Sequence, residues 1–216
     1  MINAGGGTGG ATVFSGEQLN HTNAEVVYMD ISITSMHIAQ KRARVRNLQN
    51  IIWIKSWIED IPSHGIGFFE EVLSSGVLHH LKNPLLGLKV LKDVLSTNGG
   101  MGLMLYAKYG RISFYQMQKI FKIINANQND IDTEIQNANK TLFSIPKHNW
   151  LSVFGIRLNG VSKIDIYDVF LHERDVAFSI SSLFKWIEQG GLYFIHLDNY
   201  KNRFLLNVQY IFRMII

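Results

Sequence analysis

A glycine-rich turn within the first ten residues constrains the fold of this chain more than any other feature. The run Gly5-Gly6-Gly7-Thr8-Gly9-Gly10 follows Met1–Ala4, which has the character of a strand end, and leads into a helix predicted from Thr8 to Leu19. Glycines at such a turn let backbone N–H groups approach a ligand closely, and the helix N-terminus presents its partial positive charge to it. This pattern indicates a nucleotide-binding α/β unit.

Strand and helix signals then alternate along the chain. We expect a helix that is capped by Ser32 or Thr34 and buries Met36, Ala39, Ala43 and Leu48, and another that Pro84 opens and Asn98-Gly99-Gly100 ends. The predicted strands cover residues 25–30, 50–54, 68–75 and 101–106. Short crossovers of this kind give parallel strands, so the sequence predicts an α/β fold with a Rossmann-like, doubly wound, mostly parallel sheet.

The second half of the chain is harder to interpret. Residues 125–139 are rich in Asn, Gln and Asp, with a thin apolar edge, and we interpret them as an exposed helix or lid, with disorder as the alternative. We expect strand or loop and then helix over 165–180, a helix over 183–189, a strand over 192–197, and a buried strand or an altered end in the apolar tail 204–216. The predicted organisation is a core at 1–110, a helical or lid segment at 111–150, and a C-terminal extension at 151–216 that completes the sheet.

An acidic residue closes the second predicted strand. Asp30 follows Gly9 by 21 residues, and a carboxylate at this position can accept both hydroxyls of a ribose. The loop and the acid together indicate an adenosine cofactor. They leave its identity open, because Gly5-x-Gly7-x-x-Gly10 satisfies the dinucleotide pattern while Gly5-x-Gly7-x-Gly9 satisfies the methyltransferase pattern equally well.

Later segments favour the second pattern. Ile2–Gly9, Val27–Ser32, Ser56–Pro62, Ser74–Leu81 followed by Pro84, and Gly99–Met101 resemble, in order and spacing, the motifs of class I S-adenosylmethionine-dependent methyltransferases over residues 1–110. The sequence departs from that family at Asn3, where an acid is usual, and at Glu70 or Glu71, where Asp is usual. Residues 142–194 more loosely resemble the C-terminal extension of bacterial methyltransferases that occur beside tetratricopeptide repeats.

This resemblance implies S-adenosylmethionine as the cofactor. It also implies a set of cofactor-binding residues on the loops that follow the first four strands. They are Gly5, Gly7, Thr8, Gly9, Asp30, Ile31, Trp57, Ile58, Glu59, Ser75, Gly76 and Val77.

Candidate residues for the chemistry follow the fourth and fifth strands. His79 and His80 lie just past the fourth strand, at the edge where open α/β sheets bind ligands, and histidine titrates near neutral pH. They are the best candidates for a general base, with helix capping or packing on the cofactor as the alternative. Tyr106, Tyr109 and Arg111 could line the acceptor pocket, or could be fold-closing aromatics and a surface cation. For Asp168, His172 and Glu173 we favour a structural hydrogen-bonded cluster and expect no metal.

Composition excludes several functions. The chain lacks cysteine, which removes disulfides and covalent cytosine chemistry, and Ser74-Ser75-Gly76 stands where DNA amino-methyltransferases carry Asn-Pro-Pro-Tyr. A net charge of +4 is too modest to imply a nucleic-acid partner by itself, and we expect none. The basic run 41–46 is interpreted as a solvated helix end rather than a phosphate-binding patch. We find neither a signal peptide nor an apolar run long enough for a membrane, so we expect a cytoplasmic protein.

The predicted function is transfer of a methyl group from S-adenosylmethionine to a small molecule or a protein, with the acceptor and the oligomeric state left open. One alternative is an NAD(P)-dependent oxidoreductase that uses the same loop. It would draw on Tyr115-x-x-x-Lys119, which we interpret as a chance match. The other alternative is a non-catalytic module with the methyltransferase fold.

Overall fold

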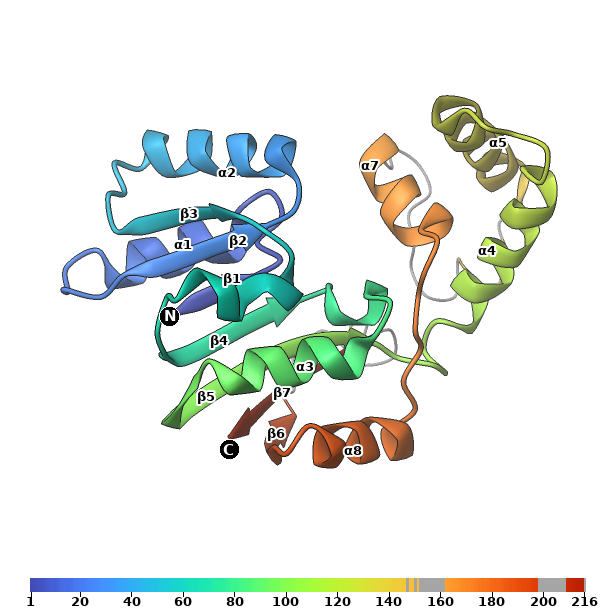
Figure 1. The fold of residues 1–216 in the computed structure, drawn as a ribbon. Coiled ribbons are helices and arrows are strands. Elements are labelled where there is room, and N and C mark those ends of the chain that lie inside the picture. Colours follow the sequence, from blue (N-terminus) through green and yellow to red (C-terminus); the bar gives the residue numbers. More distant parts are fainter. Residues whose placement is uncertain (147, 150, 152–161, 198–208, 216) are drawn as a thin grey trace. The chain divides into compact units, whose positions relative to one another are not determined.

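The computed structural model describes residues 1–146, 148–149, 151, 162–197 and 209–215 (Figure 1). By their contacts these residues form two compact units. The sheet unit contains the described residues of 1–106, 176–197 and 210–215, and the helical unit contains those of 107–175 together with residue 209. The sequence-based division at residues 110 and 150 follows segments of the chain rather than contacts, and it stays a prediction.

Within the described residues the sheet has seven strands in the order β3-β2-β1-β4-β5-β7-β6. Their bounds are β1 (Ile2–Ala4), β2 (Val26–Asp30), β3 (Ile51–Lys55), β4 (Phe69–Ser75), β5 (Leu95–Tyr106), β6 (Tyr193–Leu197) and β7 (Gln209–Ile215). β1 pairs in parallel with β2 and β4, β2 pairs in parallel with β3 and β4 with β5, and β6 pairs antiparallel with β7. The predicted α/β, Rossmann-like, mostly parallel sheet is confirmed. Because the strand order reverses between β1 and β4, their carboxyl ends form the switch point where such sheets bind ligands.

Helices cover both faces of this sheet (Figure 1). The helices α1 (Gly10–Leu19) and α2 (Ile33–Val45) share one hydrophobic cluster with β2, and it contains the predicted inward positions Met36, Ala39, Ala43 and Leu48. Crossovers between parallel strands are right-handed, so the direction of a crossover along the sheet decides which face its helix covers. The crossovers of α1 and α2 lead toward β3, whereas α3 (Pro84–Asp93) joins β4 to β5 in the opposite direction and therefore covers the other face. The helix α8 (Ile180–Gln189) lies beside α3, since a Cβ at its C-cap Gly190 would be 2.4 Å from Cδ2 of Leu88.

Two predicted boundaries were wrong. The first helix begins at Gly10 instead of Thr8, because Gly9 adopts a left-handed φ of 87° that a helix cannot include. The second error concerns Asn98-Gly99-Gly100, which does not end α3: the helix stops at Asp93 and these residues belong to β5. The pairing with β4 shifts register there, and a Cβ at Gly99 would lie 3.0 Å from the carbonyl oxygen of Glu70, so glycine permits a close approach of two backbones.

The helical unit contains α4 (Ile112–Ile124), α5 (Ile131–Ser144), α7 (Lys163–Ile166) and the π-helical segment η3 (Tyr167–Leu171). Its core brings together Phe114, Phe121, Ile135, Leu142 and Phe170. Much of the polar stretch that we interpreted as an exposed helix or lid is therefore an amphipathic helix, α5, with one buried face.

Over 165–180 the prediction of strand or loop and then helix was wrong, because the helical segments α7 and η3 come first and an irregular stretch follows them. After residue 180 the chain follows the predicted pattern where it is described. The expected strand 192–197 is β6, and β7 falls within the apolar tail and pairs with β6. The remainder of that tail, and much of the stretch after Pro146, lie outside the described residues. In the described part of the chain, no helix is both long enough and apolar enough to span a bilayer.

Candidate functional site

The glycine loop is tied to the end of β2. The N–H groups of Gly5 and Gly6 both donate to the carbonyl oxygen of Met29, at 2.8 and 2.9 Å. Gly5, Gly7 and Gly9 have φ values of 78°, 51° and 87°, which side chains with a Cβ rarely adopt. The loop therefore depends on glycine for its conformation and on β2 for its position.

Asp30 fixes the other side of this loop. Its Oδ2 accepts a hydrogen bond from the N–H of Gly7, and its Oδ1 accepts one from the N–H of Ser32, both at 2.8 Å. Ser32 in turn caps α2, because its hydroxyl oxygen accepts from the N–H of Ser35. The carboxylate is held against the turn by two backbone donors, and hydrogen bonds to charged groups are among the stronger ones.

Tyr28 contacts the glycine loop through its side chain. Its side chain is fully buried, its ring lies 4.9 Å from that of Trp53, and its hydroxyl donates to the carbonyl oxygen of Gly7 at 2.7 Å. Burial, followed by the negative charge of Asp30, raises the pKa of the Tyr28 phenol above its ordinary value. The neutral phenol is therefore the form that the fold requires.

We expect Tyr28→Phe to lower the free energy of unfolding by about 1 kcal/mol at pH 7, the usual net contribution of a hydrogen bond. The difference from the wild type should shrink above about pH 10, because the unfolded phenol ionises there while the folded one stays neutral. At pH 10.5 the shrinkage should be about 0.8 kcal/mol. Urea unfolding of both proteins at pH 7, 9 and 10.5 measures how the stability difference changes with pH. A difference that does not depend on pH would contradict the raised pKa of the Tyr28 phenol.

The loops after the other strands meet the glycine loop at the same edge. The N–H of Ser56, just after β3, donates to the carbonyl oxygen of Asp30 at 3.1 Å. After β4, Val77 lies so close to Gly5 that a Cβ there would be 2.2 Å from its Cγ2. The structure thus brings together the loops that carry the residues predicted from the sequence to bind the cofactor.

Within these loops the predicted residues differ in exposure. Ile31 and Trp57 present apolar surface, with 50% and 58% of it exposed, whereas Ile58 is buried. Beside the glycine loop there is open space, since a Cβ at Gly7 or Gly10 would meet no atom within 4 Å. The amide nitrogen of Asn3 is buried without a hydrogen-bond partner among the described residues, so β1 offers a donor where related sequences offer an acid.

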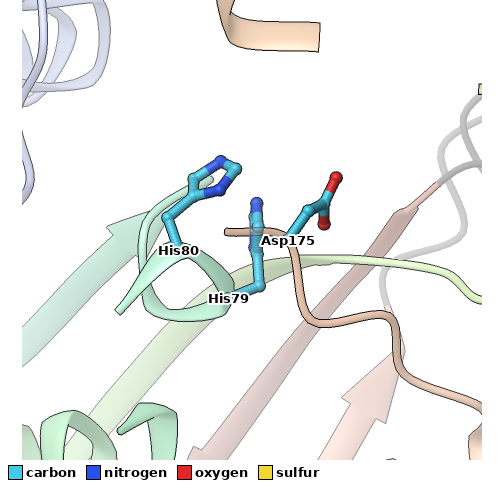
Figure 2. A group of neighbouring side chains, drawn as sticks. All are labelled: His79, His80 and Asp175. Carbon is cyan, nitrogen blue, oxygen red and sulfur yellow. The ribbon is translucent and has the colours of Figure 1, made fainter. Parts of the chain in front are cut away.

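His79 and His80 form a short 3-10 helix with Leu78, η2 (Leu78–His80), directly after β4 (Figure 2). His79 is fully buried, and its ring centroid lies 4.0 Å from that of Tyr106 and 4.1 Å from that of His80. The N–H of Val176 donates to the carbonyl oxygen of His79 at 2.9 Å. His79 is therefore a packed part of the sheet unit, whereas His80 is partly exposed.

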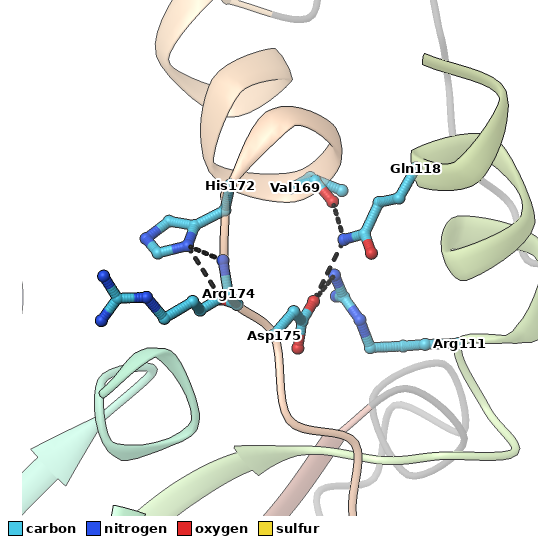
Figure 3. A network of polar contacts seen from close by, with 6 residues as sticks. All are labelled: Arg111, Gln118, Val169, His172, Arg174 and Asp175. Atoms are coloured by element: carbon cyan, nitrogen blue, oxygen red, sulfur yellow. Dashed lines mark hydrogen bonds and ion pairs between the residues drawn. The ribbon is translucent and has the colours of Figure 1, made fainter. Parts of the chain in front are cut away.

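The remaining predicted acceptor-pocket residues belong to the helical unit. Tyr109 is 64% exposed, but Arg111 is 3% exposed and is thus no surface cation. Its Nη2 lies 3.8 Å from Oδ2 of Asp175, whose side chain is 5% exposed (Figure 3). The amide of Gln118 donates to the same oxygen at 3.1 Å and to the carbonyl oxygen of Val169 at 3.0 Å.

This buried network was missed in the sequence. Gln118 and Asp175 are 57 positions apart, and the sequence carries no local signal that pairs them. Asp168, His172 and Glu173 do not form a group able to hold a cation among the described residues. His172 instead contacts the backbone of Arg174, with its Nδ1 2.8 Å from the carbonyl oxygen (Figure 3).

Comparisons with known proteins agree with this geometry. Residues 2–101 match the family model described as a methyltransferase domain. An uncharacterized protein of Synechococcus sp. is 27% identical over 205 residues, which cover 90% of this chain and 47% of that protein. The chain thus spans about half the length of the curated relative that it matches.

Solved structures share the fold at low sequence identity. PKMT2 from Rickettsia typhi, in complex with AdoHcy, matches 99% of this chain and 48% of its own, with a TM-score of 0.73 and 13% identity. Magnesium protoporphyrin IX methyltransferase from Synechocystis PCC 6803, with bound SAH, matches 99% and 71%, with a TM-score of 0.60 and 14% identity. A SAM-dependent methyltransferase from Aquifex aeolicus matches 100% and 81%, with a TM-score of 0.57 and 12% identity.

The sheet order, the glycine loop with its acid, and these matches define the class. The sheet unit has the class I, Rossmann-like methyltransferase fold. Residues 2–101 match the model of the methyltransferase domain family.

Proposed function

We propose that this chain binds S-adenosylmethionine at the carboxyl edge of β1, β2 and β4 and transfers its methyl group to a small-molecule or protein acceptor. The observation that carries the proposal is the Asp30 carboxylate, which the N–H groups of Gly7 and Ser32 hold beside the glycine loop at the switch point of the sheet. The family of residues 2–101, and the AdoHcy or SAH in two proteins of the same fold, support this cofactor.

Residues on the loops after the first four strands would share the contacts with the cofactor. Gly5, Gly7, Thr8 and Gly9 would contact it through their backbone, with the open space beside Gly7 as the point of closest approach. Asp30 would accept the ribose hydroxyls. Exposed apolar surface from Ile31 and Trp57 would cover the adenine, with Glu59, Ser75, Gly76 and Val77 completing the rim. The side chain of Ile58 is buried, so this residue would contribute through its backbone.

Methyl transfer demands alignment more than acid–base chemistry. The sulfonium already activates the methyl carbon, so the protein must mainly orient the acceptor and exclude water. Where the acceptor arrives protonated, His80 is the better candidate for a general base, because it is partly exposed while His79 is fully buried against Tyr106. Tyr106 and Tyr109 stay candidates for acceptor contacts, whereas the buried ion pair of Arg111 with Asp175 favours an anchoring role for this arginine.

Isothermal titration calorimetry of the purified chain with S-adenosylmethionine, S-adenosylhomocysteine and NAD tests the proposal. We expect the first two to bind and NAD to give no heat. Binding of NAD alone would contradict the proposal and favour an NAD(P)-dependent oxidoreductase. If folded protein bound none of the three, a non-catalytic module with this fold would become the better description. Incubation with methyl-tritiated cofactor and separate protein and small-molecule fractions would then identify the acceptor class.

A further inference from the structure

Arg42 contacts the glycine loop from α2. Its Nη1 donates to the carbonyl oxygen of Thr8 at 2.9 Å and also lies 3.1 Å from the hydroxyl oxygen of Thr8. The two residues are 34 positions apart, and both belong to the sheet unit. In the sequence, Arg42 lies in the basic run that we interpreted as a solvated helix end. The residue is exposed in the structure, in agreement with that interpretation, and the contact with Thr8 is an additional feature that the sequence did not indicate.

Thr8 is flanked by glycine on both sides in the loop. It lies between Gly7 and Gly9, which both adopt left-handed φ values and have the widest conformational freedom of any residue type. On one side, the N–H of Gly7 bonds to Asp30 and its carbonyl oxygen accepts from Tyr28. On the other, the N–H of Gly9 donates to the carbonyl oxygen of Gly6. The guanidinium of Arg42 is the side-chain group that holds Thr8 between these two glycines.

We propose that Arg42 is a positioning residue for the cofactor, which it does not touch: it holds Thr8, and thereby keeps the glycine loop in the binding conformation before the cofactor arrives. A loop that is ordered in advance loses less conformational entropy on binding, and the affinity rises accordingly. Guanidinium is suited to this role because Nη1 carries two N–H groups, which can donate to the carbonyl oxygen and the hydroxyl oxygen of Thr8 at once. The inference rests on the proposed function, since it concerns the affinity of the same site.

Binding of S-adenosylhomocysteine by calorimetry, with Arg42→Ala, Arg42→Lys and Arg44→Ala, tests this role. We expect Arg42→Ala to weaken binding about tenfold through a less favourable entropy, and Arg42→Lys to restore part of it, because the ammonium group can still donate to Thr8 but lacks the planar geometry of the guanidinium. Arg44 lies exposed two residues further along α2, so Arg44→Ala is the matched control and should bind like the wild type. Amide hydrogen exchange over residues 5–12 should be faster in Arg42→Ala, with the thermal unfolding midpoint close to that of the wild type.

The variant Thr8→Val completes a double-mutant cycle. If Arg42 acts through Thr8, the combined variant Thr8→Val/Arg42→Ala should lose less affinity than the sum of the single losses. Wild-type affinity and exchange in Arg42→Ala would overturn the positioning role while leaving the proposed function intact. Strictly additive losses would overturn the part of the route that uses the Thr8 hydroxyl and assign the restraint to the carbonyl oxygen, which Thr8→Val leaves in place. Absence of S-adenosylhomocysteine binding in the wild type would instead overturn the proposed function and, with it, this inference.

Discussion

Asp30→Ala should lower the affinity for S-adenosylhomocysteine by at least about a hundredfold. Each hydrogen bond from a ribose hydroxyl to a carboxylate contributes about 1.5 kcal/mol or more, and two of them correspond to about two orders of magnitude in the dissociation constant. The substitution also removes the acceptor that the N–H of Gly7 has at 2.8 Å, so part of the loss would come from a looser loop. Calorimetric titration of wild type and variant measures the change.

Two further variants separate these contributions. Asp30→Asn keeps the size of the side chain and one carbonyl oxygen, so it can hold one backbone donor but only part of a ribose contact, and we expect an intermediate affinity. Asp93→Ala removes an exposed aspartate at the end of α3, whose contact with Lys92 is long at 4.0 Å, and it should bind like the wild type. Unchanged affinity in a folded Asp30→Ala would remove Asp30 from the cofactor site.

Local patterns were enough to predict the parts of the fold that position the site. The apolar run that ends in Asp30, and the glycines between strand and helix, each fix one element through residues that are adjacent in sequence. The parallel sheet follows because its strands alternate with helices. The acid and the glycine loop then meet for a topological reason: β1 and β2 are paired neighbours, so their carboxyl ends lie at one edge.

What the sequence did not reveal depends on partners far along the chain. Asn98-Gly99-Gly100 has the composition of a helix end, and only the pairing of β5 with β4 makes it a strand. The sequence left Arg111 open between a contact to the acceptor and a surface cation, because its partner, Asp175, is distant in sequence and lies in a stretch without clear periodicity. Arg42 was indistinguishable from its basic neighbours, since helical periodicity places it on an exposed face and says nothing about a loop 34 positions away.

Gly9→Ala should be the most damaging small substitution in the loop, lowering the free energy of unfolding by about 3 kcal/mol or more. A left-handed φ costs a residue with a Cβ about 1–2 kcal/mol, and Gly9 has a φ of 87°. Overpacking adds about 1–3 kcal/mol, because the new Cβ would lie 2.5 Å from Cβ and 2.9 Å from Cα of Ala39, which is fully buried in α2. Urea unfolding gives the free energy directly.

The neighbouring glycines provide matched controls that isolate each cost. A Cβ at Gly7 would meet no atom within 4 Å but would keep the strained φ of 51°, so Gly7→Ala should cost about 1–2 kcal/mol. Gly10 opens α1 without a positive φ and also faces open space. Gly10→Ala should therefore be neutral or stabilising by up to about 1 kcal/mol.

The clash itself can be relieved from the opposite side. Ala39→Gly removes the Cβ that Gly9→Ala would strike but leaves the backbone contact and the strained φ, so the double variant should recover only part of the lost stability. Equal stabilities for the Gly9 and Gly7 variants would mean that the close packing of the loop on α2 is absent in solution, because both variants carry the cost of a left-handed φ and only Gly9→Ala would strike Ala39. If the predicted order holds, with Gly9 most sensitive, Gly7 intermediate and Gly10 tolerant, then glycine is required at Gly9 by its contact with α2 and at Gly7 by its backbone conformation alone.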